Sequence, residues 1–318
     1  MQLASRVFLL HALGSCLAAW SAFKGSSDPR ALDADNAGKP LDGYFFGVMT
    51  APDNFAARDA IRKGWIKNFV RQGASYRFFI GSEGLDEAHV RKINAAEDVV
   101  GLPFVDSYMN LTRKTMAAAN WTASNLENLQ YFIKIDDDVY PCVEEFKRGA
   151  ATFKPERFYG GRKMENFKVM TEGTWALPEK YWSMFPEGIY PTYAEGPMYV
   201  LSGDLLRHLG AQFEPALSDE DVFPFEDINT GVYLNEKNIQ VIEPSTETTC
   251  YILSHHYKRG EDSNWYDTHC SKNYRAYHTL SPTFLVEAAT AEEAAGTEGV
   301  KRLVCKSQMF RAGAWVDF

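Results

Sequence analysis

Three consecutive aspartates at the end of an apolar segment constrain this chain more than any other feature. Residues 131–135 read Tyr-Phe-Ile-Lys-Ile, and their aromatic and β-branched side chains predict a buried strand of a parallel sheet. Asp136, Asp137 and Asp138 follow directly. Adjacent carboxylates repel one another and are poorly solvated at a buried strand end, and a bound cation removes both costs.

The ligand that such a strand end would bind follows from its chemistry. Carboxylate oxygens suit Mg²⁺ or Mn²⁺, which keep several waters and take phosphate oxygens as further ligands. Ligands of open α/β sheets bind at the carboxyl ends of the strands. The segment therefore predicts a metal–diphosphate site, and the alternative is an acidic turn exposed to solvent.

The composition disfavours one class of function, nucleic-acid binding. The chain has 318 residues with 45% hydrophobic and 24% charged residues, which predicts a globular core. The formal net charge is −9, whereas a general nucleic-acid binder is more often basic. We therefore expect no nucleic-acid partner.

The N-terminal segment predicts entry into the secretory pathway. Arg6 precedes the mostly apolar residues 7–23, and about 17 such residues are at the lower limit for spanning a bilayer. The segment is equally consistent with a cleaved signal peptide, with small residues around Ala19 as the cleavage site. On the first interpretation residues 1–6 are a short cytoplasmic tail, and the polar residues 24–43 form a stem.

The cysteines and sequons agree with an oxidising compartment. Cys16 lies in the apolar segment, and the other four cysteines are Cys142, Cys250, Cys270 and Cys305. An even number predicts two disulfides, but three pairings stay open. Asn110 and Asn120 each begin a glycosylation sequon.

Strand-like and helix-like segments alternate along the first half of the chain. Strands are expected at 44–49, 76–81 and 98–106, and helices at 55–70, 84–96 and 110–123. This alternation predicts an α/β fold with a right-handed, mostly parallel, doubly wound sheet. The Ala/Glu/Gly-rich residues 290–299 are expected to be mobile.

Two stretches of the second half have functional interest. Residues 173–193 are rich in Trp and Tyr and form the best candidate platform for a sugar acceptor, although an aromatic core under a loop is the alternative. Glu226 and Asp227 form a second acidic pair just before a predicted helix, where capping of that helix is the competing interpretation.

Several blocks resemble, in order, one family of enzymes. The most specific is residues 106–115, which read Asp-Ser-Tyr-Met-Asn-Leu-Thr-Arg-Lys-Thr, and the others are residues 58–65, 77–81, 134–138, 190–202 and 226–231. Together they resemble the β-1,3-galactosyltransferase-like hexosyltransferases of glycosyltransferase family 31. This family also includes N-acetylglucosaminyl- and Fringe-type enzymes. The resemblance runs from about Tyr44 to about Ala288.

The resemblance implies a fold, a reaction and a location. It implies a GT-A nucleotide-sugar-binding α/β fold over residues 44–288, a catalytic domain followed by a tail over 289–318. The implied reaction is inverting transfer of galactose, in β-1,3 linkage, from a UDP-sugar to a glycan hydroxyl on protein or lipid. The implied location is the Golgi membrane, in a single-pass type II protein that residues 7–23 anchor and whose catalytic domain is lumenal.

The resemblance also implies a Mn²⁺ site at the aspartates. Asp138 is expected to bind the metal directly, with Asp136 and Asp137 near the ribose and the metal-bound waters. A late histidine is the expected further ligand. His278 best matches the family's His-x-x-Ser-Pro ending, and His255 is the second choice, with His256 a third candidate.

Other residues receive roles from the same resemblance. Arg58 and Arg62 are expected near the diphosphate or uracil of the donor, and Lys114 and Lys134 are further donor-binding candidates. Asp227 is predicted to be the general base that takes the acceptor proton. Glu226 is expected to orient Asp227 or to bind the acceptor.

Alternatives remain within and outside this class. UDP-galactose, UDP-N-acetylglucosamine and UDP-N-acetylgalactosamine are not separated, because a few loop residues decide between a hydroxyl and an acetamide. An inactive lumenal carbohydrate-binding protein would not need both the aspartate triplet and Asp227. A metal-dependent diphosphate hydrolase would require more carboxylates and histidines around the metal.

Overall fold

The computed structural model describes residues 38–173, 175–213, 222–243, 276–277 and 281–312, with side chains to residue 303 in the last segment. The predicted anchor at 7–23, His255 and His256, and His278 lie outside these residues, as do Cys250 and Cys270. The disulfide pairing therefore stays a prediction. Within the described part of the chain, no helix is long and apolar enough to span a membrane.

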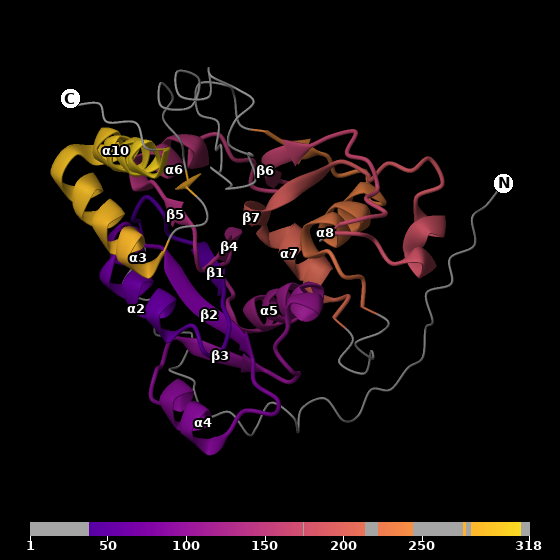
Figure 1. Ribbon diagram of the computed structural model, residues 1–318, viewed down its shortest axis with the longest axis horizontal. Helices are drawn as coiled ribbons and strands as arrows, with labels where there is room; N and C mark the ends of the chain where they lie inside the picture. The colour runs from indigo at the N-terminus through magenta and orange to yellow at the C-terminus, as the bar shows by residue number, and fades with distance from the viewer. Residues whose placement is uncertain (1–37, 174, 214–221, 244–275, 278–280, 313–318) are drawn as a thin grey trace.

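A seven-stranded mixed sheet forms the centre of the protein (Figure 1). Its order is β3-β2-β1-β4-β7-β6-β8. In chain order the strands are β1 (Tyr44–Met49), β2 (Ser75–Gly81), β3 (Val99–Leu102), β4 (Tyr131–Asp136), β6 (Tyr159–Met164), β7 (Tyr193–Ser202) and β8 (Val241–Ile242). The first four are mutually parallel, and β7 runs antiparallel to β4 and β6. This confirms the predicted α/β class with a mostly parallel sheet.

Helices cover both faces of the sheet (Figure 1). Those on one side are α2 (Phe55–Lys63), α3 (Ile66–Arg71), α6 (Val143–Ala150) and α10 (Pro282–Ala312). Those on the other side are α5 (Leu111–Asn125), α7 (Gly203–Gly210) and α8 (Glu226–Asn235). Helix α4 (Glu87–Asn94) precedes β3, and a short ribbon pairs β5 (Tyr140–Pro141) with β9 (Ala276–Tyr277).

Alternation along β1 explains why both faces are covered. Phe46 and Val48 belong to the core under α2, α3, α6 and α10, whereas Phe45 and Met49 belong to the core under α5 and α7. Successive strand residues point to opposite faces, so a strand that is apolar throughout must be buried on both.

The order of the strands reverses between β1 and β4, and this creates a position for a ligand at the carboxyl ends of these two strands. The chain passes from β1 through β2 to β3 on one side, and then crosses to β4 on the other side of β1. Met49 at the end of β1 lies beside Asp136 at the end of β4. Ligands of open α/β sheets bind at such a reversal, so the acidic turn lies where the fold favours a ligand.

The helix predicted over 55–70 is two helices that meet at Gly64 and Trp65. Trp65 is fully buried. A Cβ on Gly64 would lie 2.8 Å from the carbonyl oxygen of Ala60 and 3.3 Å from that of Leu285 in α10. The break therefore allows α10 to approach this corner closely, a tertiary constraint that helical periodicity cannot reveal.

The prediction that residues 290–299 are mobile is wrong. These residues continue α10 beyond the expected domain boundary at residue 288, with a kink at Ala295 and Gly296, where Gly296 has φ +61°. Ala289 and Val300, on either side of the stretch, are buried in the core. Alanine has the highest helix propensity, and burial of small side chains against α2 completes the packing.

The first sequon is unsuited to glycosylation in the folded protein. Asn110 is 1% exposed, and its Nδ2 donates to the carbonyl oxygen of Val105 at 3.0 Å. A glycan on that nitrogen would require this segment to open.

Packing of α10 gives a stability prediction. Leu285 is fully buried, whereas its neighbour Val286 is 36% exposed. Leu285→Ala should lower the free energy of unfolding by about 2–5 kcal/mol, because it leaves a cavity. Val286→Ala should change it by no more than about 0.5 kcal/mol. Urea unfolding of the two variants measures the difference, and equal effects would contradict the packing of α10 on the domain.

Candidate active site

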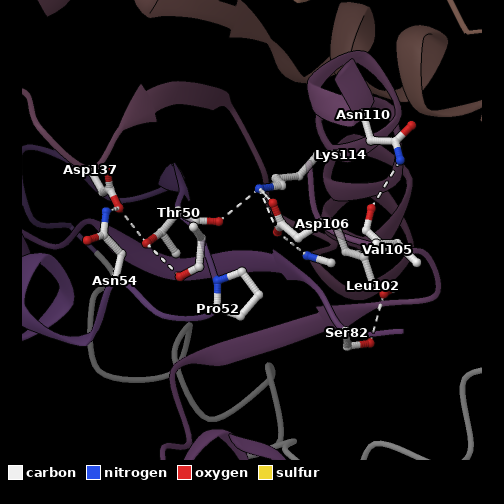
Figure 2. Close-up of polar contacts among 12 residues, drawn as sticks. Thr50, Pro52, Asn54, Ser82, Leu102, Val105, Asp106, Asn110, Lys114 and Asp137 are labelled. Carbon is white, nitrogen blue, oxygen red and sulfur yellow. Dashed lines mark hydrogen bonds and ion pairs between the residues drawn. The ribbon is translucent and has the colours of Figure 1, made fainter. Parts of the chain in front are cut away.

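The acidic turn after β4 is tied to the loop after β1. Asp136, Asp137 and Asp138 are all partly exposed. The carboxylate of Asp137 accepts hydrogen bonds from Thr50 Oγ1 at 2.5 Å and from Asn54 Nδ2 at 2.7 Å (Figure 2). Burial raises the pKa of Asp137 above its usual value, and these two bonds oppose that shift.

Arg58 is hydrogen-bonded to the same loop. It is 1% exposed, and its guanidinium donates to the carbonyl oxygens of Ala51 at 2.5 Å and Pro52 at 2.7 Å, with Thr50 Oγ1 at 3.3 Å. Arg58 thus shapes the loop that binds Asp137. Its expected contact with the donor stays a prediction.

Arg62 has strong protein partners elsewhere. Its Nε and Nη2 each donate to the carboxylate of Asp98 at 2.8 Å, and Nη1 donates to Asp59 at 2.7 Å. The hydrogen bond with Asp98 is the main reason why the pKa of Arg62 is raised. Asp98 directly precedes β3, so the structure joins Arg62 to that strand rather than to the acidic turn.

Lys114 joins the ends of β1 and β2. Its buried ammonium donates to the carbonyl oxygen of Thr50 and to Asp106, both at 2.8 Å (Figure 2). Asp106 also accepts from the backbone N–H of Gly81 at 2.6 Å. Burial lowers the pKa of Lys114, and the adjacent Asp106 opposes that shift. Lys114 therefore fixes the strand ends that surround the acidic turn.

Lys134 connects the two acidic groups of the sequence. It is 2% exposed, in the interior of β4, and its Nζ donates to Asp136 and to the carbonyl oxygen of Gly196, both at 2.6 Å. A carboxylate oxygen of Glu226 lies 3.4 Å from the same nitrogen. Although burial opposes the charge, Asp136 and Glu226 raise the pKa of Lys134 above its usual value. The ammonium therefore stays charged between two carboxylates.

Glu226 is held in place by further partners. Its Oε1 accepts from Tyr199 Oη at 2.5 Å and from Thr230 Oγ1 at 3.3 Å. Tyr199 lies on β7 directly opposite Lys134 of β4. Glu226 is only 6% exposed, so its carboxylate is buried among these partners.

Asp227 has the properties of a proton acceptor. Its Oδ2 accepts from the N–H of Gly196 at 3.0 Å and its Oδ1 from the N–H of Ile228 at 2.8 Å. Burial and the neighbouring Glu226 raise the pKa of Asp227 to about 7. A Cβ on Gly196 would lie 3.2 Å from Oδ2, so glycine allows this close backbone approach. A partly exposed carboxyl that titrates near neutrality suits general base catalysis.

The predicted metal site is only partly within the described residues. No group of three or more His, Cys, Asp or Glu side chains able to hold a metal occurs in that part of the chain. His278 lies outside it. The carboxylates of Asp136 and Asp138 fit Mn²⁺ as oxygen ligands at a strand end, provided that phosphate oxygens and waters complete the coordination.

Comparison with known proteins identifies the family. The sequence model of the family described as galactosyltransferase matches residues 56–245, which is more than half of the chain. The chain belongs to the galactosyltransferase family. The resemblance predicted from the six sequence blocks is thereby confirmed, and the matched segment contains both acidic groups.

Curated relatives agree with this assignment. The chain is 28% identical over 248 residues to hydroxyproline O-galactosyltransferase GALT6 of Arabidopsis thaliana, with 76% of this chain and 34% of the relative covered. It is 30% identical over 253 residues to GALT5 of the same plant, with 76% and 34% covered. Human β-1,3-galactosyltransferase 2 is 24% identical over 222 residues, with 65% and 50% covered. The chain thus spans about a third of the length of the plant relatives.

Solved structures of glycosyltransferases also show similarity, but at a low level. One is a glycosyltransferase involved in glycosylation of the major capsid of PBCV-1, with 14% identity, a TM-score of 0.41, and 78% of this chain and 98% of that chain covered. At this level the similarity carries no argument about the site.

Some residues of the site are not predictable from the sequence motifs alone. Thr50 and Asn54 gain their importance from hydrogen bonds to Asp137, far away in the chain. Lys134 did carry a signal, because a lysine inside an apolar strand requires a buried partner. The identity of that partner, Glu226, depends on the pairing of β4 with β7 and could not be predicted.

The raised pKa of Asp227 predicts a pH dependence of stability. The ordinary value is 3.8 and the folded value about 7, so the folded state binds this proton more tightly. The stabilisation is complete below about pH 4 and is lost as the pH rises through 7, with a slope of at most about 1.4 kcal/mol per pH unit. Asp227→Asn should therefore show a shallower decline in unfolding free energy over this range than wild type.

Urea unfolding across this pH range measures the difference between the two proteins. Glu236→Gln, at the exposed C-terminal end of the same helix, serves as the control. An unchanged slope in Asp227→Asn would show that Asp227 is ionised with an ordinary pKa.

Proposed function

We propose that this chain is an inverting hexosyltransferase that moves galactose from UDP-galactose to a glycan hydroxyl, forming a β-1,3 linkage. The observation that carries the proposal is the joining of Asp136 to Glu226, the neighbour of Asp227, through Lys134, within a chain of the galactosyltransferase family. The proposal includes a GT-A fold and a type II protein of the Golgi membrane, anchored by residues 7–23.

Asp227 acts as the general base in this proposal. It takes the proton of the acceptor hydroxyl while the oxygen attacks C1 of the sugar on the face opposite UDP. The C1–oxygen bond to UDP breaks, and its electrons leave with the diphosphate. The configuration at C1 is thereby inverted. Because Asp227 has a pKa of about 7, a substantial fraction is ionised at neutral pH and can accept the proton.

The donor is bound at the end of β4. Asp136 and Asp138 would hold Mn²⁺ through their carboxylate oxygens, and His278 is proposed as a further ligand. Mn²⁺, when bound, stabilises the negative charge of the departing diphosphate. Asp137 keeps the loop at 50–54 in place beside the donor through Thr50 and Asn54.

The identity of the donor has one specific competitor. A human relative named as a β-1,3-N-acetylglucosaminyltransferase is 28% identical over 207 residues, with 60% of this chain and 52% of the relative covered. UDP-N-acetylglucosamine is therefore the second candidate donor. The names of the plant relatives make the hydroxyl of hydroxyproline one acceptor that assays should include.

Fewer aromatic residues of the segment 173–193 can contact an acceptor sugar than the sequence predicts. Phe185, Tyr190 and Tyr193 are buried in a local core, so they are not a platform. Trp175 donates from Nε1 to Tyr108 Oη at 3.1 Å, and Tyr108 is 61% exposed. We assign this pair to the acceptor sugar, since aromatic rings offer flat apolar faces with a polar edge.

Tyr108 begins a short 3₁₀ helix that continues directly into α5, and the first turn of α5 contacts the segment before the proposed base. Thr112 Oγ1 donates to the carbonyl oxygen of Phe223 at 2.7 Å, and Phe223 belongs to the segment that leads into Glu226. Tyr108→Ala should raise the acceptor KM about 3- to 10-fold with little change in kcat. Tyr108→Phe, which keeps the ring, should stay near wild type. Initial rates over a series of acceptor concentrations measure both, and a KM unchanged in Tyr108→Ala would rule out this acceptor site.

The central activity test is acceptor-dependent release of UDP. We expect release from UDP-galactose with Mn²⁺ and an acceptor, and kcat/KM should rise with pH through an apparent pKa of about 7. Asp227→Asn should lower kcat by about 10²- to 10⁴-fold. Glu236→Gln should not change it, since Glu236 is exposed at the far end of α8.

Two results would contradict the proposal in different ways. Full activity of Asp227→Asn would exclude Asp227 as the base. UDP release that is equally fast without any acceptor would instead favour a hydrolase.

A further inference from the structure

Glu292 of helix α10 is a buried carboxylate that the proposed reaction does not use. It is 8% exposed. Its Oε2 accepts from Tyr140 Oη and its Oε1 from the backbone N–H of Val143, both at 2.8 Å. Burial raises the pKa of Glu292, while these two hydrogen bonds oppose the shift. Glu292 also lies beyond residues 56–245, the segment that the galactosyltransferase family model matches.

One of the two bonds completes the start of helix α6. Val143 is the first residue of α6, and the preceding Cys142 makes no side-chain capping bond. The first N–H groups of a helix have no partner within that helix. Glu292 supplies a partner from a distant part of the chain, and its negative charge favours the N-terminal end of α6.

The other bond acts on the exit of the acidic turn. The turn that begins at Asp136 closes when the N–H of Val139 donates to the carbonyl oxygen of Asp136 at 3.3 Å. Val139 and Tyr140 follow Asp138 directly and are fully buried. The hydrogen bond from Tyr140 to Glu292 therefore anchors the chain two residues beyond Asp138.

The acidic turn is thus supported from two sides. Thr50 and Asn54 bind Asp137 from the β1 side. Glu292 holds Tyr140 and Val143 from the α10 side. Tyr140 also pairs with Tyr277 in the β5–β9 ribbon, which adds a backbone contact to the same segment.

We propose that Glu292 is a positioning residue of the donor site, which fixes the carboxylates of Asp136 and Asp138 for a nucleoside diphosphate by anchoring Tyr140 and Val143 to α10. This inference rests on the proposed function, which assigns the acidic turn to the donor. It gives helix α10 a part in donor binding.

A positioning role differs from a purely structural one in what a substitution changes. If Glu292 only contributed to stability, its loss would lower the unfolding midpoint and leave UDP affinity of the folded protein intact. If Glu292 positions the turn, the folded variant binds UDP more weakly. Losses of about 10- to 100-fold are typical when a residue that orients ligating groups is removed.

The test is calorimetric titration of UDP into the full chain with MnCl₂, with UDP alone as a parallel series. Glu292→Ala should weaken UDP binding at least about tenfold in MnCl₂. Glu292→Gln keeps an acceptor for Val143 and should remain within about threefold of wild type. Glu293→Ala is the matched control, since Glu293 is the adjacent residue, 46% exposed, and forms a surface ion pair with Lys67 at 2.9 Å.

The outcomes distinguish a failure of this inference from a failure of the proposed function. Absence of UDP binding by folded wild type would overturn both. Wild-type affinity in a Glu292→Ala protein that is folded by circular dichroism would overturn this inference alone. If Glu292→Ala does not fold, Tyr140→Phe takes its place with an expected weakening of about threefold, and unchanged affinity in that variant would overturn the inference.

Discussion

The arrangement of the site depends on the ion pairs of one buried ammonium group, that of Lys134. It lies between Asp136, at the end of β4, and Glu226, at the start of α8, and it also binds the backbone of Gly196. Burying charge is costly unless the partners are close and well hydrogen-bonded, and a hydrophobic replacement is often as stable. Stability alone therefore does not explain this cluster. Its consequence is that Asp136 and the start of α8 are held at fixed positions relative to each other.

The same cluster divides the roles of two neighbouring carboxylates. Glu226 is 6% exposed and bound by Tyr199, Thr230 and Lys134. Asp227 is partly exposed and accepts hydrogen bonds from the backbone N–H groups of Gly196 and Ile228. The pKa of Asp227 rises to about 7 because burial and the charge of Glu226 disfavour its ionised form. One accessible carboxyl with a near-neutral pKa suits a single proton transfer. A retaining double displacement would need a carboxylate placed as a nucleophile as well.

Sequence patterns predicted the α/β sheet and the place of Asp136 at the end of a strand, but not the partners of the charged side chains. The apolar run at 131–135 and the alternation of segments suffice to place Asp136 at a strand end of a parallel sheet. Helical periodicity located Arg58 and Arg62 on one helix, yet their partners, the loop at 50–54 and Asp98, come from other elements. Composition alone also predicted that residues 290–299 are mobile, whereas they belong to α10. The packing of α10 against α2 and the hydrogen bonds of Glu292 are tertiary effects that composition does not show.

In the proposed reaction Asp227, held beside Glu226, is the base of a single displacement at C1 of the sugar. The anomeric configuration of the product tests this claim most directly. UDP-galactose carries an α-linked sugar, so a single base and one displacement must give a β-linked product. Proton NMR of the isolated disaccharide should show the large H1–H2 coupling of a β-galactoside. A small coupling, from an α-linked product, would show retention of configuration, which attack on the face opposite UDP cannot give, and would contradict the role of Asp227.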